Sequence, residues 1–308
     1  MNCLWSNAAC RLEDLGQGVL GAVLCAEDQV ISGLSLDGLE RGLQELLAGN
    51  WLGLVLTSAG PHFALGASLP VLWENFEQGQ WAELEARGRR FQGLNLALAS
   101  SPRPVVAAVR GYALGGGCEL AMHCRAVLAQ PAARFGLVES RAGILPAAGG
   151  CKEMSFRART SDQAEQALVT LTRGLLAGDA AEAFQLGYLR PGIDRTGSLD
   201  QARELVLQLA QQAAPKAVTT FSISCGHDEL LAGLERQGGW SRFDRYLGQQ
   251  AAYLLSGGRA RGEPIEVQQL LDLEREVLRE LGTNPRTRAR MRYLLQAGLI
   301  QQLQNPES

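Results

Sequence analysis

Lysine is almost missing from this chain of 308 residues, in which Lys152 and Lys216 are the only lysines among 29 basic residues. Genome composition is the simplest reason, but any anionic ligand is then expected to meet arginine or backbone N–H groups. The formal charge of −3 argues against a nucleic-acid partner held by phosphate contacts. No apolar run reaches the length of a membrane span, and residues 1–14 lack a signal-peptide pattern, so we expect neither.

A cysteine framework is absent as well. The seven cysteines are odd in number, irregularly spaced and without a C-x-x-C pair, which predicts buried free thiols in a reduced, cytoplasmic protein. Cys118, His123 and Cys124 are close in sequence, but their offsets fit neither a helical face nor a zinc knuckle. We therefore interpret these three as packing residues and assign no metal.

Two widespread functional signatures are missing or misplaced. The chain has no G-x-S-x-G nucleophile elbow. Residues 16–21 match G-x-G-x-x-G, but a polar stretch precedes them and an apolar strand follows. A dinucleotide site needs a strand before the glycines and a helix after them. We interpret this segment as a loop that leads into a strand.

Apolar patterning changes at about residue 190. Before this point, runs typical of strands alternate with helical spacing, over the ranges 18–26, 36–47, 51–56, 71–100 and 105–109. Asp179 and Glu182 form the pattern of a helix capping box. The alternation predicts an α/β core over residues 1–195.

The rest of the chain, residues 196–308, is expected to be helical, and Arg190–Gly197 is the best linker candidate. Asn284 and Pro285 are typical of the start of a last helix. Four arginines follow at alternate positions, 286, 288, 290 and 292. They fit a solvated helix end, or a surface that contacts a phosphate or another subunit, and both interpretations stay open.

The segment from residue 105 to residue 139 carries the strongest chemical signal. A buried strand leads into the glycines at 115–117 and then into an apolar helix that contains Glu119. The glycines let a ligand approach the backbone, and the first N–H groups of a helix have no internal acceptor. Glu139 lies in a second apolar setting, so the two glutamates suggest an acid/base pair. Spacing alone also allows Glu119 to lie on an exposed helix face and Glu139 to cap a turn.

These residues resemble the crotonase (enoyl-CoA hydratase/isomerase) superfamily. The resemblance rests on V-V-A-A-V-R-G-Y-A-L-G-G-G-C-E-L-A-M at 105–122, F-G-L-V-E at 135–139 and F-A-L-G-A-S-L at 63–69. It covers roughly residues 15–195. Later segments, including the last helix, are similar to the hydratase portion of bacterial 3-hydroxyacyl-CoA dehydrogenase/enoyl-CoA hydratase fatty-oxidation proteins. The resemblance implies an α/β crotonase-like ββα spiral over 1–195, followed by an all-helical extension over 196–308.

The resemblance also implies roles for single residues. Backbone N–H groups of Ala67 and Gly116 would form an oxyanion hole for the thioester oxygen of an acyl-CoA. Glu119 would deprotonate a water, and Glu139 would exchange the proton at the α carbon. The surrounding substrate-binding residues would be Ala64, Leu65, Gly66, Leu114, Gly115 and Gly117. This chemistry, an enoyl-CoA hydratase reaction, needs no metal or other cofactor beyond the coenzyme A of the substrate.

Two alternatives remain beside hydration. One is a Δ3,Δ2-enoyl-CoA isomerase, which would depend on Glu139 but not on Glu119. The other is a catalytically impaired acyl-CoA-binding partner of a separate 3-hydroxyacyl-CoA dehydrogenase, suggested by Ser68, Ser140 and Arg141, which differ from the residues usual in the family. The resemblance further implies a homotrimer or a dimer of trimers.

Overall fold

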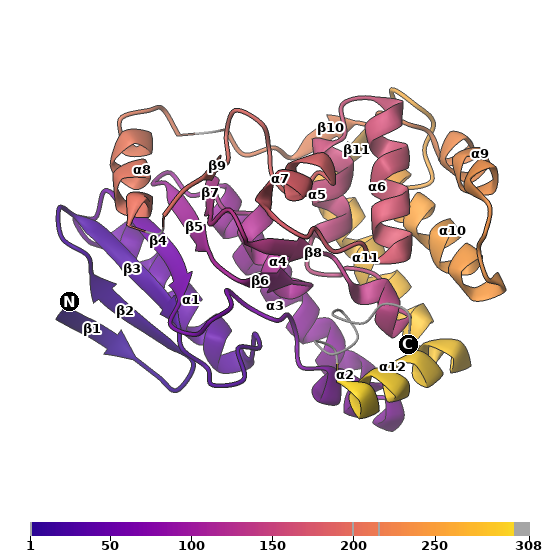
Figure 1. Ribbon diagram of the computed structural model, residues 1–308, viewed down its shortest axis with the longest axis horizontal. Helices are drawn as coiled ribbons and strands as arrows, with labels where there is room; N and C mark the ends of the chain where they lie inside the picture. The colour runs from indigo at the N-terminus through magenta and orange to yellow at the C-terminus, as the bar shows by residue number, and fades with distance from the viewer. Residues whose placement is uncertain (1, 199, 215, 299–308) are drawn as a thin grey trace. The chain divides into compact units, whose positions relative to one another are not determined.

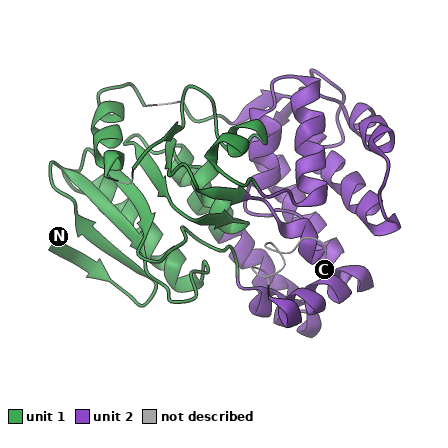
Figure 2. Cartoon of the chain, viewed as in Figure 1, with its two compact units in different colours: residues 1–67, 91–135, 177–218 green, residues 68–90, 136–176, 219–308 purple. Residues whose placement is uncertain are grey.

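The computed structural model describes residues 2–198, 200–214 and 216–298. The chain forms two compact units, and each is built from three separate stretches (Figure 2). Unit 1 comprises residues 1–67, 91–135 and 177–218; unit 2 comprises residues 68–90, 136–176 and 219–308. The predicted boundary at residue 195 divides the chain once, whereas the chain passes from one unit to the other several times. No helix within the described ranges is long and apolar enough to cross a bilayer.

Unit 1 begins with a meander of three strands (Figure 1): β1 (Asn2–Ser6), β2 (Cys10–Asp14) and β3 (Val19–Leu24), each antiparallel to the next. The G-x-G-x-x-G segment is the turn between β2 and β3, and Gly16, Gln17 and Gly18 all have positive φ. A loop that leads into a strand is confirmed. The stretch before it, interpreted as polar, is itself a strand, Cys10–Asp14, with three buried and two partly buried positions.

The other half of the sheet is parallel. Strands β4 (Gly53–Ser58), β5 (Val105–Val109), β7 (Ala126–Ala129) and β9 (Arg195–Thr196) follow β3 in that order, so the described sheet has seven strands. Strands β3, β5 and β7 are buried at every position, which explains their unbroken apolar sequence.

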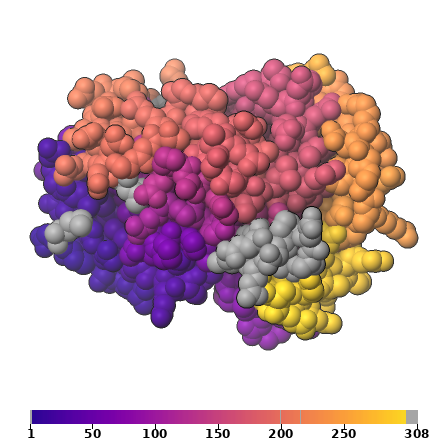
Figure 3. Space-filling view, in the orientation of Figure 1, coloured from indigo at the N-terminus to yellow at the C-terminus, as the bar shows by residue number. Residues whose placement is uncertain are grey.

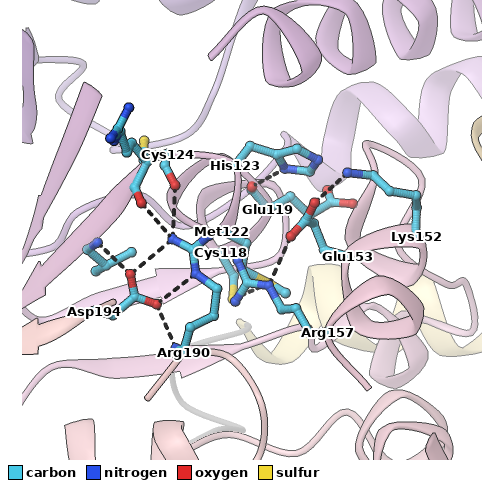
Figure 4. Close-up of polar contacts among 12 residues, drawn as sticks. Cys118, Glu119, Met122, His123, Cys124, Lys152, Glu153, Arg157, Arg190 and Asp194 are labelled. Atoms are coloured by element: carbon cyan, nitrogen blue, oxygen red, sulfur yellow. Dashed lines mark hydrogen bonds and ion pairs between the residues drawn. The ribbon is translucent and has the colours of Figure 1, made fainter. Parts of the chain in front are cut away.

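Arg190–Gly197 is not a linker, because it supplies the edge strand β9 and is tied to β7. The buried Asp194 carboxylate accepts hydrogen bonds from the N–H groups of Val127 (2.8 Å) and Arg190 (2.6 Å). The Arg190 guanidinium pairs with the same carboxylate and donates to the carbonyl oxygens of Cys124 and Arg125 (Figure 4). A buried ion pair therefore lies in the segment that the Pro-Gly sequence predicted to be a linker.

Among the described residues, four helices lie wholly within unit 1: α1 (Gly33–Ala48), α4 (Gly116–Met122), α7 (Ala180–Gln185) and α8 (Gln201–Ala210). Helix α1 packs on β2 and β3, and α8 packs on β3, β4 and β5 through an apolar cluster that includes Leu205 and Val206. Helix α8 and nearby residues form the upper left surface in the space-filling view (Figure 3). Asp179 caps α7 as predicted, accepting from the Glu182 N–H, while the Glu182 carboxylate accepts from the Gly178 N–H.

The predicted long helix over 71–100 is two helices, α2 (Leu69–Gln78) and α3 (Trp81–Ala99). Gly79 ends α2 in the left-handed conformation, with φ of 64°, and its N–H bonds to the Asn75 carbonyl. The apolar stripe that predicted the long helix, from Trp81 to Leu98, lies wholly within α3, so it did not show where α2 ends. Helix α3 contributes its first residues to unit 2 and its last residues to unit 1.

Unit 2 is mainly helical. Its helices are α2, the 3₁₀ turn η1 (Glu139–Ala142), α5 (Gly150–Arg157), α6 (Ser161–Arg173), α9 (His227–Gln237), α10 (Arg242–Ser256), α11 (Val267–Thr283) and α12 (Pro285–Ala297). The short pair β10 (Thr220–Ser222) and β11 (Pro264–Glu266) interrupts the region predicted to be all helix. Asn284 caps α12 and Pro285 is in its first turn, as predicted.

Candidate active site

Two stretches of backbone come together in unit 1, beside the short strands β6 (Tyr112–Leu114) and β8 (Arg134–Gly136). The Ala64 N–H donates to the Tyr112 carbonyl (3.2 Å), and the Leu114 N–H donates to the Ala64 carbonyl (2.9 Å). Leu65 and Gly66 are fixed on their other side, by bonds to Gln29 and Ile31. The structure therefore brings the predicted stretch 64–67 against the predicted stretch 114–117.

Glycine makes this contact possible. A Cβ on Gly117 would lie 2.6 Å from the Ala64 carbonyl oxygen, and one on Gly66 would lie 3.0 Å from the Leu114 carbonyl oxygen. Gly66 also has φ of 89°, a conformation that strains other residues. The glycines thus serve the approach of one backbone to another, in addition to any approach of a ligand.

The amides of Ala67 and Gly116 lie near each other. The Cβ position of Gly116 is 3.7 Å from the Ala67 nitrogen and 2.9 Å from Cε1 of Phe91. Within the described residues, neither of these two N–H groups donates a hydrogen bond to the chain. Phe91 was predicted only as part of an apolar helical stripe, and no sequence signal indicated that its ring lies against the triple glycine.

Glu119 lies one turn into α4 and is 3% exposed. Its backbone carbonyl accepts hydrogen bonds from the N–H of His123 (3.2 Å) and from Nδ1 of the same residue (2.7 Å; Figure 4). The prediction that Glu119 could sit on an exposed helix face is therefore wrong. His123 and Cys124 act as packing residues at the end of α4, where the Cys124 thiol donates to the Leu120 carbonyl.

Glu139 is in unit 2, where it begins η1. The turn is held from two directions. Helix α12 donates from Thr287 Oγ1 to the Gly143 carbonyl (2.7 Å) and from Arg290 to the Ser140 carbonyl (3.1 Å). The Arg141 Nε donates to the Gly174 carbonyl (3.0 Å), just after α6. Glu139 is the first residue of this turn, but the alternative in which it caps the turn is wrong, because the N-cap position is Val138.

The segment that follows the candidate oxyanion loop begins with Ser68, where the family usually has aspartate. Ser68 is the N-cap of α2, and its hydroxyl accepts from the Val71 N–H at 3.5 Å. Serine and aspartate are both favoured at N-caps, so the substitution preserves a local role. Across the described ranges, no group of three or more histidine, cysteine or acidic side chains is placed to hold a metal ion.

Comparison with known proteins identifies the family. Residues 41–232 match the profile of the enoyl-CoA hydratase/isomerase family. Over 95% of its length, the chain is 28% identical to a probable 3-hydroxyacyl-CoA dehydrogenase of Bacillus subtilis, of which it spans 39%. Over 53% of its length, it is 32% identical to a probable enoyl-CoA hydratase of Mycobacterium bovis, of which it spans 60%.

The fold agrees with this assignment. The crystal structure of an enoyl-CoA hydratase from Bacillus halodurans is similar over 93% of this chain and 100% of that one, with a TM-score of 0.67 and 18% identity. The chain therefore belongs to the enoyl-CoA hydratase/isomerase family of the crotonase superfamily of enzymes, and it has the crotonase fold with a helical C-terminal region.

Proposed function

We propose that the protein is an enoyl-CoA hydratase, which adds water across the 2,3 double bond of an enoyl-CoA thioester. One observation carries the proposal: the amides of Ala67 and Gly116 are neighbours, and within the described residues neither donates a hydrogen bond to the chain. Two such donors suit the thioester oxygen, where negative charge develops as the enolate forms.

The two glutamates complete the proposed chemistry. Glu119 takes a proton from water as the water oxygen attacks C3, and Glu139 delivers a proton to C2. The thioester is retained and no electrons leave the substrate, so the reaction needs neither a metal nor a redox cofactor. General acid/base catalysis of this kind contributes about 10²–10⁴ to the rate.

The glutamates are tested by following the loss of enoyl-thioester absorbance with short and long substrates. Glu119→Gln and Glu139→Gln should each lower kcat by about 10²-fold or more. Glu204→Gln, in the first turn of α8, is the control and should leave kcat unchanged. Absence of turnover on every chain length would refute hydration. If the protein instead converts 3-enoyl thioesters into 2-enoyl thioesters, seen as a gain of the same absorbance, and only Glu139→Gln abolishes this gain, the Δ3,Δ2-isomerase is favoured.

The backbone contact has its own test. Gly117→Ala should push the Ala64 carbonyl away, because backbone atoms 2.6 Å from the new Cβ cannot rotate aside. We expect kcat to fall by about 10²-fold, the effect of losing one oxyanion donor. Gly93→Ala in α3 is the matched control, because its Cβ would meet no atom within 4 Å. Equal activity in both variants would contradict an oxyanion role for this contact.

A dehydrogenase partner is the second proposal. The Bacillus subtilis relative is named a probable 3-hydroxyacyl-CoA dehydrogenase, and the match spans only 39% of it. Hydration yields a 3-hydroxyacyl thioester, the substrate class of such an enzyme. We further propose that the protein acts in the cytoplasm as a homotrimer or dimer of trimers. Analytical ultracentrifugation, alone and with a 3-hydroxyacyl-CoA dehydrogenase, tests both the assembly and the partner.

A further inference from the structure

A cavity lies entirely within unit 2. It has a volume of about 310 Å³, and its walls carry three guanidinium groups, one carboxylate, one indole and two hydroxyls: Arg141, Arg173, Arg290, Asp244, Trp240, Ser140 and Thr172. At about 30 Å³ for each water, it holds roughly ten waters, which is enough for a small organic ion. The proposed acid/base chemistry does not use these side chains.

The three arginines come from separate elements, namely η1, the last residue of α6, and α12. Arg290 pairs with Asp244 of α10 and lies 4.8 Å from the centre of the Phe243 ring. Arg173 lies 4.7 Å from the centre of the Trp240 ring, and within the described residues no carboxylate lies in ion-pair distance of it. The cavity therefore gathers more positive than negative charge.

Charge and geometry together select the ligand class. Three arginines and one aspartate give the lining a net charge of 3 − 1 = +2, and a phosphate monoester carries about −1.5 to −2 at pH 7. Guanidinium groups offer paired N–H donors that match the oxygens of such a group. Ser140 is 2% exposed, and its Oγ has no hydrogen-bond partner within the described part of the chain.

We propose that this cavity binds a small molecule through a phosphate monoester group, with Arg173 as its principal free charge. The proposal does not depend on the hydratase assignment. It also gives two arginines of the last helix different roles. Arg288 is used structurally, on the Phe76 carbonyl and Glu77, whereas Arg290 faces the cavity.

The test is calorimetric titration of the full chain with inorganic phosphate and with glycerol 3-phosphate. Both should bind saturably, and Arg173→Gln should weaken binding by about tenfold or more, as expected for loss of a charge-assisted hydrogen bond. Arg159→Gln is the matched control, because Arg159 also lies 4.7 Å from an aromatic ring, that of Phe156, but does not line the cavity. This control should change binding by less than about twofold.

A second variant, Asp244→Asn, distinguishes a direct effect on phosphate binding from damage to the fold. Removing the one acidic group of the lining should tighten phosphate binding, a gain that damage to the fold would not produce. Absence of saturable binding at millimolar ligand would overturn the proposal. So would equal weakening by Arg173→Gln and Arg159→Gln, because that result would reflect overall charge.

The phosphate group has two possible sources, a free metabolite or the 3′-phosphate of coenzyme A. Titration with coenzyme A and with 3′-dephospho-coenzyme A distinguishes them. If Arg173→Gln weakens only the first of these two, the substrate supplies the group. If coenzyme A does not displace glycerol 3-phosphate, a separate metabolite supplies the phosphate group. Either result supports a phosphate site. If no phosphate compound binds while enoyl-CoA is still hydrated, this proposal fails and the hydratase proposal stands.

Discussion

Replacement of Asp194 by alanine should destabilise unit 1 strongly, although the Pro-Gly sequence nearby is typical of a linker, where a substitution has little effect on stability. The side chain of Asp194 is fully buried, whereas that of Arg190 is 24% exposed. Breaking a buried ion pair costs about 3–5 kcal/mol of unfolding free energy. Because water can reach part of the Arg190 side chain, we expect the lower end, about 3 kcal/mol, including the loss of the acceptor for the Val127 N–H.

Urea unfolding followed by circular dichroism measures this loss. Asp194→Asn keeps an acceptor for Val127 but not the charge, and should fall between wild type and Asp194→Ala. Asp200→Ala is the control, because Asp200 is exposed and its side chain makes no cap bond to α8. It should change stability by less than about 0.5 kcal/mol. A loss below about 1 kcal/mol in Asp194→Ala would refute the claim that this ion pair fastens β9 to β7.

Three further predictions concern single side chains. Burial lowers the pKa of His62 below its usual 6.5, so on acidification the unfolded chain takes up a proton before the folded chain does. The free energy of unfolding should therefore be highest above pH 6.5 and decline at lower pH. His62→Gln should flatten this pH dependence, as measured by urea titrations. Ellman's reagent should label Cys3 rapidly in the native protein but Cys124 only after unfolding, because burial raises the pKa of the Cys124 thiol to about 12. Rapid native labelling of a variant with both Cys3→Ser and Cys25→Ser, which lacks the two cysteines that are not buried, would contradict this. Thr287→Val should lower the unfolding free energy of unit 2 by about 1–3 kcal/mol, because it leaves the buried Gly143 carbonyl without its donor; Thr283→Val, at an exposed hydroxyl, should not.

Strands buried on both faces were predictable from sequence. Val105–Val109 is an unbroken apolar run because parallel strands in the sheet interior face neither side to water. The first hairpin was missed for the opposite reason, since β1 is a short strand of five residues that is largely exposed. The Gly79 break was missed because a glycine inside a helical pattern is often tolerated.

The candidate active site was predictable only where its parts lie close in sequence. The triple glycine and Glu119 share one short segment, and residues 64–67 were found through a family resemblance. The reason for the glycines, contact between two backbones, needed the structure. The arginine cavity could not be found at all, because residues 141, 173 and 290 come together only after η1, α6 and α12 have packed.

The hydrogen bond from Thr287 to the Gly143 carbonyl joins two parts of the chain that are translated at different times. The two residues are 144 positions apart, and a ribosome adds about 5–20 residues each second. Roughly 7 to 30 seconds therefore pass between translation of the turn that begins at Glu139 and translation of the helix that fastens it. During that interval the Glu139 turn of the nascent chain has the bond from Arg141 to Gly174 as its support and still lacks the bond from α12.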